Sequence, residues 1–231
     1  MGFSEEEWVA IALSLKVAGL AVAISLPFGI AIAYVLARGR FAGRFLLEAA
    51  VSLPLILPPV VTGYLLLIAF GRKGFLGGFL DSAFGLVFSF RWTGAALAAA
   101  VMGFPLLVQS IRLSMEAIDA RLEQAASTLG ASPIMVFLTI TLPLSLPGIV
   151  VGMVLSFARS MGEFGATITF VSAIPGETQT LASAIHAALQ DPDGESTAWR
   201  LTLLSIGIAF SAIFLSGFVS RAVARRIGAG R

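Results

Sequence analysis

Five long apolar blocks dominate this sequence and restrict what it can fold into. They cover residues 9–37, 45–70, 94–111, 144–171 and 201–220. A helix that crosses a bilayer needs roughly 20 mostly apolar residues, within a range of about 17–25, and each block is long enough. The chain is 58% hydrophobic and 12% charged, which is too apolar for a soluble domain of 231 residues. We therefore expect an all-α integral membrane protein with about five transmembrane helices in one domain, residues 1–231.

The basic residues between the blocks predict the orientation of the chain. Nine of them fall in the alternate segments that we assign to the inside: Arg38, Arg40, Arg44, Arg112, Arg121, Arg221, Arg225, Arg226 and Arg231. Four fall in the segments assigned to the outside: Arg72, Lys73, Arg91 and Arg200. Because cytoplasmic loops carry the excess of Lys and Arg, we expect the N-terminus outside, the C-terminus inside and the loop 112–143 in the cytoplasm.

Several classes of function are excluded by residues that the sequence lacks. There is no cysteine for a disulfide or a thiolate metal site, and the single histidine, His186, cannot build a multi-histidine zinc site. Neither lysine, Lys16 or Lys73, ends a Walker A loop, so we expect no ATP, no other cofactor and no enzymatic site on this chain. The acidic start, residues 5–7, is unlike the basic start of a cleavable signal peptide, so the first span should be retained.

The stretch 123–143 is a polar, small-residue island between two apolar blocks. Residues 117–129 mix small and charged side chains and predict a short helix, which Gly130 ends because glycine readily takes the left-handed conformation of a helix C-cap. Pro133 suits the first turn of a second short helix, where its missing N–H has no partner to lose. We expect a helix–turn–helix knuckle; an ordinary helical hairpin between two spans is the alternative.

The spacing of this stretch resembles the conserved cytoplasmic loop through which ABC-importer permeases dock on their ATPase. The matching positions are Gln124, Ala125, Ala126, Gly130, Ile140, Leu142 and Pro143. Gln124 occupies the place usually held by Glu, and Glu123 comes directly before it, so the docking charge is expected one position off. The resemblance implies that Glu123 and these seven residues contact a cytoplasmic ATP-binding subunit.

Three prolines interrupt the second apolar block, at Pro54, Pro58 and Pro59. Each one removes a backbone donor and frees an upstream carbonyl, which in lipid must be satisfied by neighbouring helices or by a water-lined cavity. We expect this broken segment to face the bundle interior, with Pro58 and Pro59 on the transport pathway. A helix that is merely kinked is the alternative.

Ionisable and hydroxyl side chains gather towards the end of the fourth block. Arg159 and Glu163 are four residues apart, so they can pair on one face of a helix. Charged groups at membrane depth are costly, so this pair should face the bundle interior or water. Four nearby hydroxyls could hydrogen-bond an oxyanion: Ser156, Ser160, Thr167 and Thr169. An ion pair that only locks the helix is the alternative.

Three segments together resemble the permease subunits of bacterial molybdate ABC transporters: residues 53–64, 162–170 and 174–178. The family implies a type I ABC-importer permease, a homodimer around the pore, two cytoplasmic subunits that bind ATP and Mg²⁺, and an extracytoplasmic oxyanion-binding protein. It also implies that the chain lies in the cytoplasmic (inner) membrane of a bacterium, that it contacts lipid, and that it does not bind nucleic acid. Sulfate permeases share the Gly-Glu-aromatic-Gly pattern, so tungstate, sulfate and thiosulfate stay open as alternatives.

Two other classes of function remain alternatives. A stand-alone channel or secondary transporter would not need the cytoplasmic knuckle. An intramembrane hydrolase has little support, because no Asp lies within a predicted span and the serines have no evident base.

Three further features have two readings each. Lys16 either reaches back to the outer interface or attracts anions at the entrance. The Phe-rich loop 71–91 forms an interfacial helix, a surface for a binding protein, or both, with Trp92 as an interface anchor. The GxxxG pattern at 148–152 marks a helix crossing or is incidental.

Overall fold

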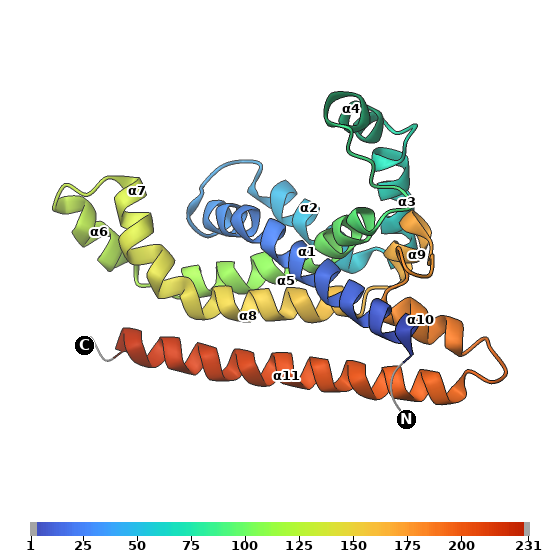
Figure 1. Ribbon diagram of the computed structural model, residues 1–231. Helices are drawn as coiled ribbons and strands as arrows, with labels where there is room; N and C mark the ends of the chain where they lie inside the picture. Colours follow the sequence, from blue (N-terminus) through green and yellow to red (C-terminus); the bar gives the residue numbers. More distant parts are fainter. Residues whose placement is uncertain (1–3, 229–231) are drawn as a thin grey trace.

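A computed structural model describes the backbone of residues 4–228 and the side chains of these residues except 216 and 219–228. Every regular element in this part of the chain is a helix (Figure 1). In chain order the elements are α1 (Glu5–Arg38), α2 (Arg44–Ile56), α3 (Pro59–Phe70), α4 (Phe75–Phe84), α5 (Trp92–Glu116), α6 (Ala120–Thr128), α7 (Pro133–Val136), the π-helical turn η1 (Phe137–Thr141), α8 (Leu142–Met161), α9 (Gly165–Val171), α10 (Leu181–Ala188) and α11 (Glu195–Gly228). Arg231 and the side chains of Arg221, Arg225 and Arg226 lie outside this description.

Four helices are long and apolar enough to cross a membrane: α1, α5, the continuous rod 133–161 that contains α8, and α11. The pair α2 and α3 makes a fifth span if it is counted as one, which agrees with the expected number. In Figure 1 the N-terminus, α9 and α10 lie at one end of the long helices, whereas α6, α7 and the C-terminal end of α11 lie at the other. This arrangement agrees with the orientation expected from the basic residues.

The second apolar block is broken and not merely kinked, because α2 and α3 meet at an angle of 115°. Pro58 is the N-cap of α3 and Pro59 is its first residue. Neither proline has the N–H that would continue the hydrogen-bond ladder of α2, so the chain turns at this point.

The prediction of one span over 144–171 is wrong at its end. Helix α8 stops at Met161, and residues 165–171 form the separate helix α9. The Glu163 carboxylate accepts a hydrogen bond from the Ala166 N–H at 2.8 Å, so it satisfies one of the free donors in the first turn of α9. The expected loop 112–143 also begins too early, because α5 runs on through Arg112 to Glu116.

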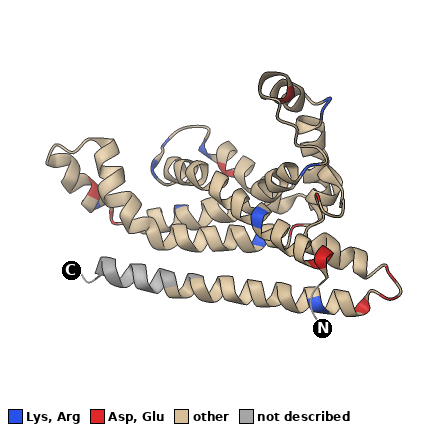
Figure 2. Cartoon of the chain, in the orientation of Figure 1, with Lys and Arg blue, Asp and Glu red and all other residues tan. Residues whose placement is uncertain are grey.

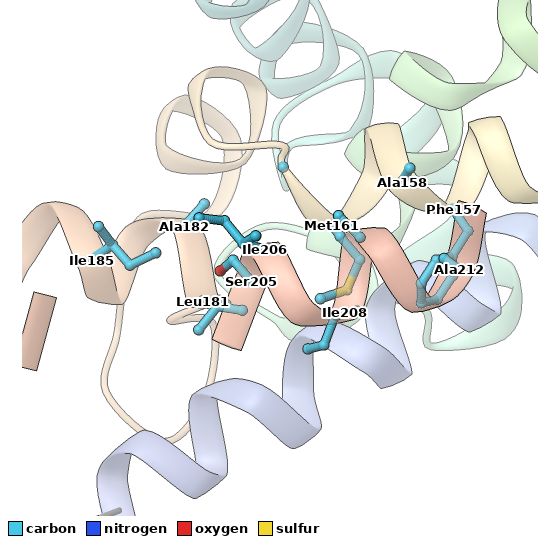
Figure 3. Close-up of a pocket in the computed structure, with 12 residues that line it drawn as sticks. Phe157, Ala158, Met161, Leu181, Ala182, Ile185, Ser205, Ile206, Ile208 and Ala212 are labelled. Carbon is cyan, nitrogen blue, oxygen red and sulfur yellow. The ribbon is translucent and has the colours of Figure 1, made fainter. Parts of the chain in front are cut away.

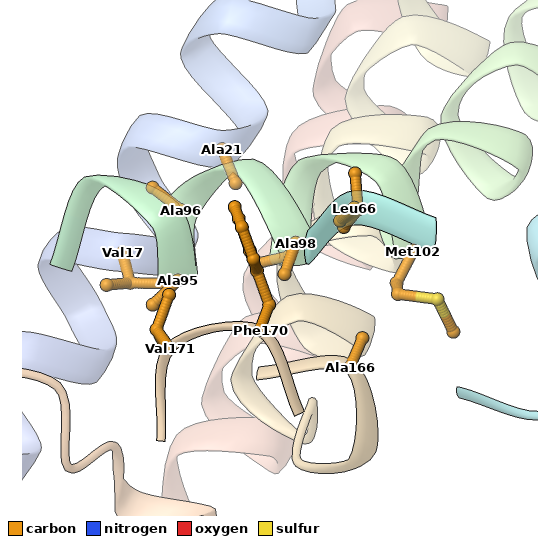
Figure 4. Close-up of a cluster of buried hydrophobic side chains, with 11 residues drawn as sticks. Val17, Ala21, Leu66, Ala95, Ala96, Ala98, Met102, Ala166, Phe170 and Val171 are labelled. Carbon is orange, nitrogen blue, oxygen red and sulfur yellow. The ribbon is translucent and has the colours of Figure 1, made fainter. Parts of the chain in front are cut away.

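The alanine-rich face of α5 forms the centre of a buried cluster (Figure 4). Four of its alanines are 3% exposed or less: Ala95, Ala96, Ala98 and Ala99. Their small side chains leave room for the ring of Phe170, which comes from α9 and is fully buried beside Val171. Packing against α5 therefore fixes the position of a helix that is only seven residues long.

Helices α5 and α8 approach each other closely through small residues. An added Cβ at Gly152 would lie 3.0 Å from the Leu107 carbonyl oxygen, and one at Gly148 would collide with the Ser114 side chain. The Ser110 hydroxyl donates to the Gly148 carbonyl at 3.0 Å. The GxxxG pattern is thus a true helix crossing.

Charged residues gather towards the ends of the long helices (Figure 2). At the outer end, Arg200 pairs with the buried carboxylate of Glu7 at 2.7 Å and so ties α11 to the start of α1. Lys16 lies over the Trp92 ring, 3.6 Å from its centroid. The Phe-rich loop contains the expected short helix, α4, whose phenylalanines Phe75 and Phe79 are 89% and 60% exposed.

Candidate functional site

The cytoplasmic knuckle forms at the place that the spacing predicts. Asp119 is the N-cap of α6 and accepts a hydrogen bond from the Arg121 N–H at 2.9 Å. Gly130 has φ +88°, and the Ala131 N–H donates back to the Ala126 carbonyl at 3.1 Å, as in a Schellman C-cap. The predicted start of this helix was three residues too early, because residues 117–119 connect α5 to α6.

The second half of the knuckle is joined rigidly to a membrane span. Pro133 is the first residue of α7, and the Ser132 hydroxyl caps it by accepting from the Met135 N–H at 3.3 Å. Helix α7 then continues through η1 into α8, so residues 133–161 form one rod of 29 residues. A force on α7 therefore acts directly on a transmembrane helix.

The outer surface of the knuckle is exposed and partly apolar. Helix α6 buries none of its residues, and Gln124, Ala125 and Gly130 are exposed. The apolar side chains of Leu129 and Ile134 are 89% and 72% exposed, and two more beside them are at least half exposed: Met135 and Leu138. Exposed apolar patches on proteins are often contact surfaces for a partner, so this surface is a candidate for one.

The other residues of the matched spacing do not all lie on this surface. Four of them are only half-exposed: Ala126, Ile140, Leu142 and Pro143. The side chain of Glu123 is 17% exposed and points towards its own chain, where it pairs with Arg38 at 2.9 Å. The knuckle thus separates an outward set, which includes Gln124, from an inward carboxylate.

The two membrane segments singled out in the sequence meet each other. An added Cβ at Gly165, the first residue of α9, would lie 2.8 Å from the Pro59 side chain of α3. One turn further along α3, an added Cβ at Gly63 would lie 2.6 Å from the Ala166 carbonyl oxygen. The broken second span and the Glu163 segment therefore form one contact, in which glycine is required on both sides.

Arg159 and Glu163 form the predicted ion pair, with 2.7 Å between Nη1 and Oε2. The glutamate side chain is 2% exposed, whereas the arginine side chain is 27% exposed. Both carboxylate oxygens of Glu163 are engaged, since Oε1 accepts from the Ala166 N–H. Glu163 thus holds the junction between α8 and α9. This geometry favours the alternative in which the ion pair locks the helix and does not bind the anion.

The four predicted hydroxyls lie on two different helices, α8 and α9. The Ser160 hydroxyl donates to the Ala99 carbonyl of α5 at 3.2 Å, and the Thr169 hydroxyl donates to the Gly165 carbonyl at 2.8 Å. Ser156 is fully buried and lies against Gly103 of α5, and Thr167 is 3% exposed. Ser156 and Ser160 lie together on α8 beside Gly103, whereas Thr167 and Thr169 belong to α9.

A further hydroxyl, Thr62 of α3, is one that sequence reasoning missed. Thr62 is 5% exposed, and in the described part of the chain its Oγ1 has no hydrogen-bond partner. It precedes Gly63 at the contact with α9. An unpaired buried hydroxyl is uncommon, and its only sequence signal was a polar residue inside the Pro-rich apolar block.

The break between α2 and α3 leaves carbonyl groups without helical donors. The last donor of α2 is the Leu57 N–H, which bonds to the Leu53 carbonyl at 3.0 Å. Pro58 and Pro59 cannot donate to the carbonyls of Pro54 and Leu55, which lie four residues before them. Backbone carbonyls without donors are tolerated at membrane depth only inside protein or beside water. The break therefore faces the protein interior or a water-filled space.

The cavity between α8, α10 and α11 is a poor candidate for an anion. Its volume is about 360 Å³, and its lining is almost wholly apolar, with Met161, Ile185 and Ile208 among the side chains that point into it (Figure 3). Ser205 is the one hydroxyl side chain of this lining. A desolvated oxyanion would find too few hydrogen-bond donors there.

Comparison with known proteins agrees with this architecture. Residues 25–227 match the family model of the binding-protein-dependent transport system inner membrane component, and the chain belongs to this family. It is a multi-pass inner-membrane protein with the fold of type I ABC-importer permeases. A solved permease of a bacterial ABC transporter that imports alginate has this fold, with a TM-score of 0.74 and 18% identity over 95% of this chain and 80% of that one.

Among curated proteins, the chain is similar to permeases named for molybdenum transport. It is 57% identical over 228 residues to the molybdenum transport system permease protein of Escherichia coli, which covers 99% of this chain and 100% of that protein. It is 54% identical over 221 residues to the permease of the same name from Haemophilus influenzae, covering 96% of each.

Proposed function

We propose that this chain is the membrane-spanning subunit of an ATP-driven importer that carries molybdate into the cell. In this proposal two copies form the pore as a homodimer, and two cytoplasmic subunits bind ATP with Mg²⁺. A binding protein outside the membrane delivers the oxyanion. The chain itself is a translocating subunit without an ATPase site.

The continuous rod of the knuckle and α8 is the observation that carries the coupling role. A stand-alone channel or secondary transporter has no need for an exposed apolar patch in the cytoplasm that is fused to a span. The patch around Leu129 and Ile134, together with Gln124 and Ala125, is the proposed ATPase contact.

The proposed route of the anion passes the contact between α3 and α9. This contact joins the break at Pro58 and Pro59 to the segment that follows Glu163, and the unpaired hydroxyl of Thr62 belongs to the residue next to Gly63. The choice of molybdate rests on the relatives of full length. Tungstate, sulfate and thiosulfate are the alternatives, because all are tetrahedral oxyanions of similar hydrogen-bonding capacity.

Uptake by the purified complex in proteoliposomes tests the substrate. We expect ATP-dependent uptake of radioactive molybdate that unlabelled molybdate and tungstate reduce strongly and sulfate reduces weakly. Stronger competition by sulfate than by unlabelled molybdate would contradict the choice of molybdate. Uptake without the ATP-binding subunits would contradict the whole proposal and favour a channel.

Copurification of the ATP-binding subunit tests the docking surface. Ala125→Arg places a long charged side chain on the exposed face, so it should abolish copurification while the permease stays in the membrane. Gly130→Ile should weaken copurification, because a β-branched residue is strained at φ +88°. Arg40→Gln, an exposed change outside the knuckle, is the control. Normal copurification by Ala125→Arg would refute the docking surface.

A further inference from the structure

The carboxylate of Glu123 ties the knuckle to two spans directly and to a third through Arg38. The Arg38 guanidinium at the end of α1 donates to both of its oxygens, with Nε 2.9 Å from Oε2 and Nη2 2.9 Å from Oε1. The Thr141 hydroxyl, which directly precedes α8, donates to Oε1 at 2.7 Å. Arg38 Nη2 also donates to the Met115 carbonyl near the end of α5 at 2.9 Å. We call Arg38, Glu123 and Thr141 the clamp.

The clamp is sheltered from water. The side chains of Arg38 and Glu123 are 23% and 17% exposed, and Thr141 is 1% exposed. Charge-assisted, two-pronged bonds between arginine and carboxylate are short, strong and fixed in direction. Screening by salt is weaker for such partly buried pairs than for surface pairs. The clamp is therefore strong enough to transmit a displacement, unlike a solvent-exposed ion pair.

Apart from the clamp, α6 is joined to the rest of the chain by its short connections to α5 and α7. Helix α6 has no buried residue, and its neighbours in the packing are α7 and η1. Gln124 and Ala125 face outward from the same turn of helix that sends Glu123 inward. The helix thus presents one face to a partner and grips three spans with the opposite face.

The turn that carries Thr141 is itself unusual. Residues 137–141 form a π-helical turn, η1, between α7 and α8. A π turn inserts one extra residue in the ladder, and such turns occur frequently at functional sites. Here it brings Thr141, the last residue of the turn, to the Glu123 carboxylate.

We propose that Glu123 is a positioning residue that couples movement of α6 to α1, α5 and α8, and that it does not contact the ATPase. This inference rests on the proposed function, in which α6 and α7 dock on that subunit. When the partner moves α6, the clamp pulls on the inner ends of three spans at once. Without the clamp, movement of α6 no longer pulls directly on α1, and the rod of α7 and α8 is left to pass the movement on.

Three single variants break the clamp at different atoms: Glu123→Gln, Arg38→Gln and Thr141→Val. Each should insert in the membrane, copurify with the ATP-binding subunit and allow ATP hydrolysis in the reconstituted complex. Molybdate taken up per ATP hydrolysed should fall about 10-fold for Glu123→Gln and Arg38→Gln, because each loses a charge-assisted pair. Thr141→Val removes only one hydrogen bond, so it should lower the uptake per ATP by less.

A double variant and two controls make the test specific. Arg38→Gln combined with Glu123→Gln should reduce uptake per ATP by less than the product of the two single effects, because both changes remove the same Arg38–Glu123 pair. Arg40→Gln, two residues from the clamp and exposed, should behave like the wild type. Ala125→Arg should lose copurification, which separates a docking defect from a coupling defect.

Each result decides for or against the clamp. If Glu123→Gln loses the ATP-binding subunit while Arg38→Gln and Thr141→Val keep it, Glu123 is a docking residue and the inference is wrong. Normal uptake per ATP in Glu123→Gln and Arg38→Gln would also overturn it. If Ala125→Arg still copurified, the failure would lie with the proposed docking surface and not with the clamp.

Discussion

Gly63→Ala tests whether the contact between α3 and α9 is as tight as the structure shows. The new Cβ would lie 2.6 Å from the Ala166 carbonyl oxygen and 2.9 Å from Thr169 Cβ. Non-bonded heavy atoms ordinarily stay about 3.5–4.0 Å apart, so the two helices must separate by about 1 Å. The atoms that must move include backbone, which cannot rotate away as the end of a long side chain can.

The expected cost follows from this overlap. Forcing one extra methyl group into a packed contact costs about 1–3 kcal/mol. The matched controls are Gly19→Ala in α1 and Gly207→Ala in α11, where an added Cβ meets nothing within 4 Å. In an open helical position the same change stabilises by about 0.5–1 kcal/mol, since alanine loses less backbone entropy. The signs of the two effects are therefore opposite.

Thermal unfolding of the purified complex and molybdate uptake in proteoliposomes measure these effects. We expect Gly63→Ala to lower the midpoint of unfolding and to reduce uptake, because it displaces α3 from the segment after Glu163. Gly19→Ala and Gly207→Ala should leave both quantities unchanged or raise the midpoint. If Gly63→Ala were as well tolerated as the controls, the close contact would be incorrect, and with it the proposed route.

Three other changes have expected outcomes. Glu163→Ala should destabilise the complex by about 3 kcal/mol in thermal unfolding, because it leaves the guanidinium of Arg159 without its partner; stability equal to the wild type would count against the ion pair. Lys16→Met should change stability by less than about 1 kcal/mol and leave uptake at low salt unaffected, whereas a large loss of uptake would favour an anion-attracting role. Pro58→Ala combined with Pro59→Ala should let the second span straighten, which spin labels on α2 and α3 would report as an increased distance; an unchanged distance would show that packing alone sets the bend.

Local chemistry made part of this structure predictable. The number of spans follows from block length, and the turn at Gly130 and the helix start at Pro133 follow from the backbone preferences of these two residues. The break at Pro58 and Pro59 follows from two missing donors in succession. Each of these predictions needs only residues within a few positions of one another.

The features that the sequence did not predict depend on contacts between distant segments. Between α8 and α9 the Glu163 carboxylate accepts from the Ala166 N–H and pairs with Arg159, and hydropathy alone cannot detect these bonds. The inward direction of Glu123 depends on Arg38, which is 85 residues away. The hydroxyl of Thr62 is notable because the fold buries it without a hydrogen-bond partner in the described part of the chain. One sequence shows which residues can bond, but not which of them meet.

Helix α8 connects the two ends of the proposed mechanism. The rod from Pro133 to Met161 has 29 residues and is therefore about 44 Å long, longer than the roughly 30 Å hydrocarbon core of a bilayer. Its inner end carries the knuckle and reaches the clamp through Thr141. Its outer end stops just before Glu163, whose carboxylate bonds to the first turn of α9 against the broken helix α3. Residues 162–164 link the rod to α9, and the ion pair of Glu163 with Arg159 ties this link to the end of the rod. We therefore expect a shift of the rod at the knuckle to displace the contact at Gly63.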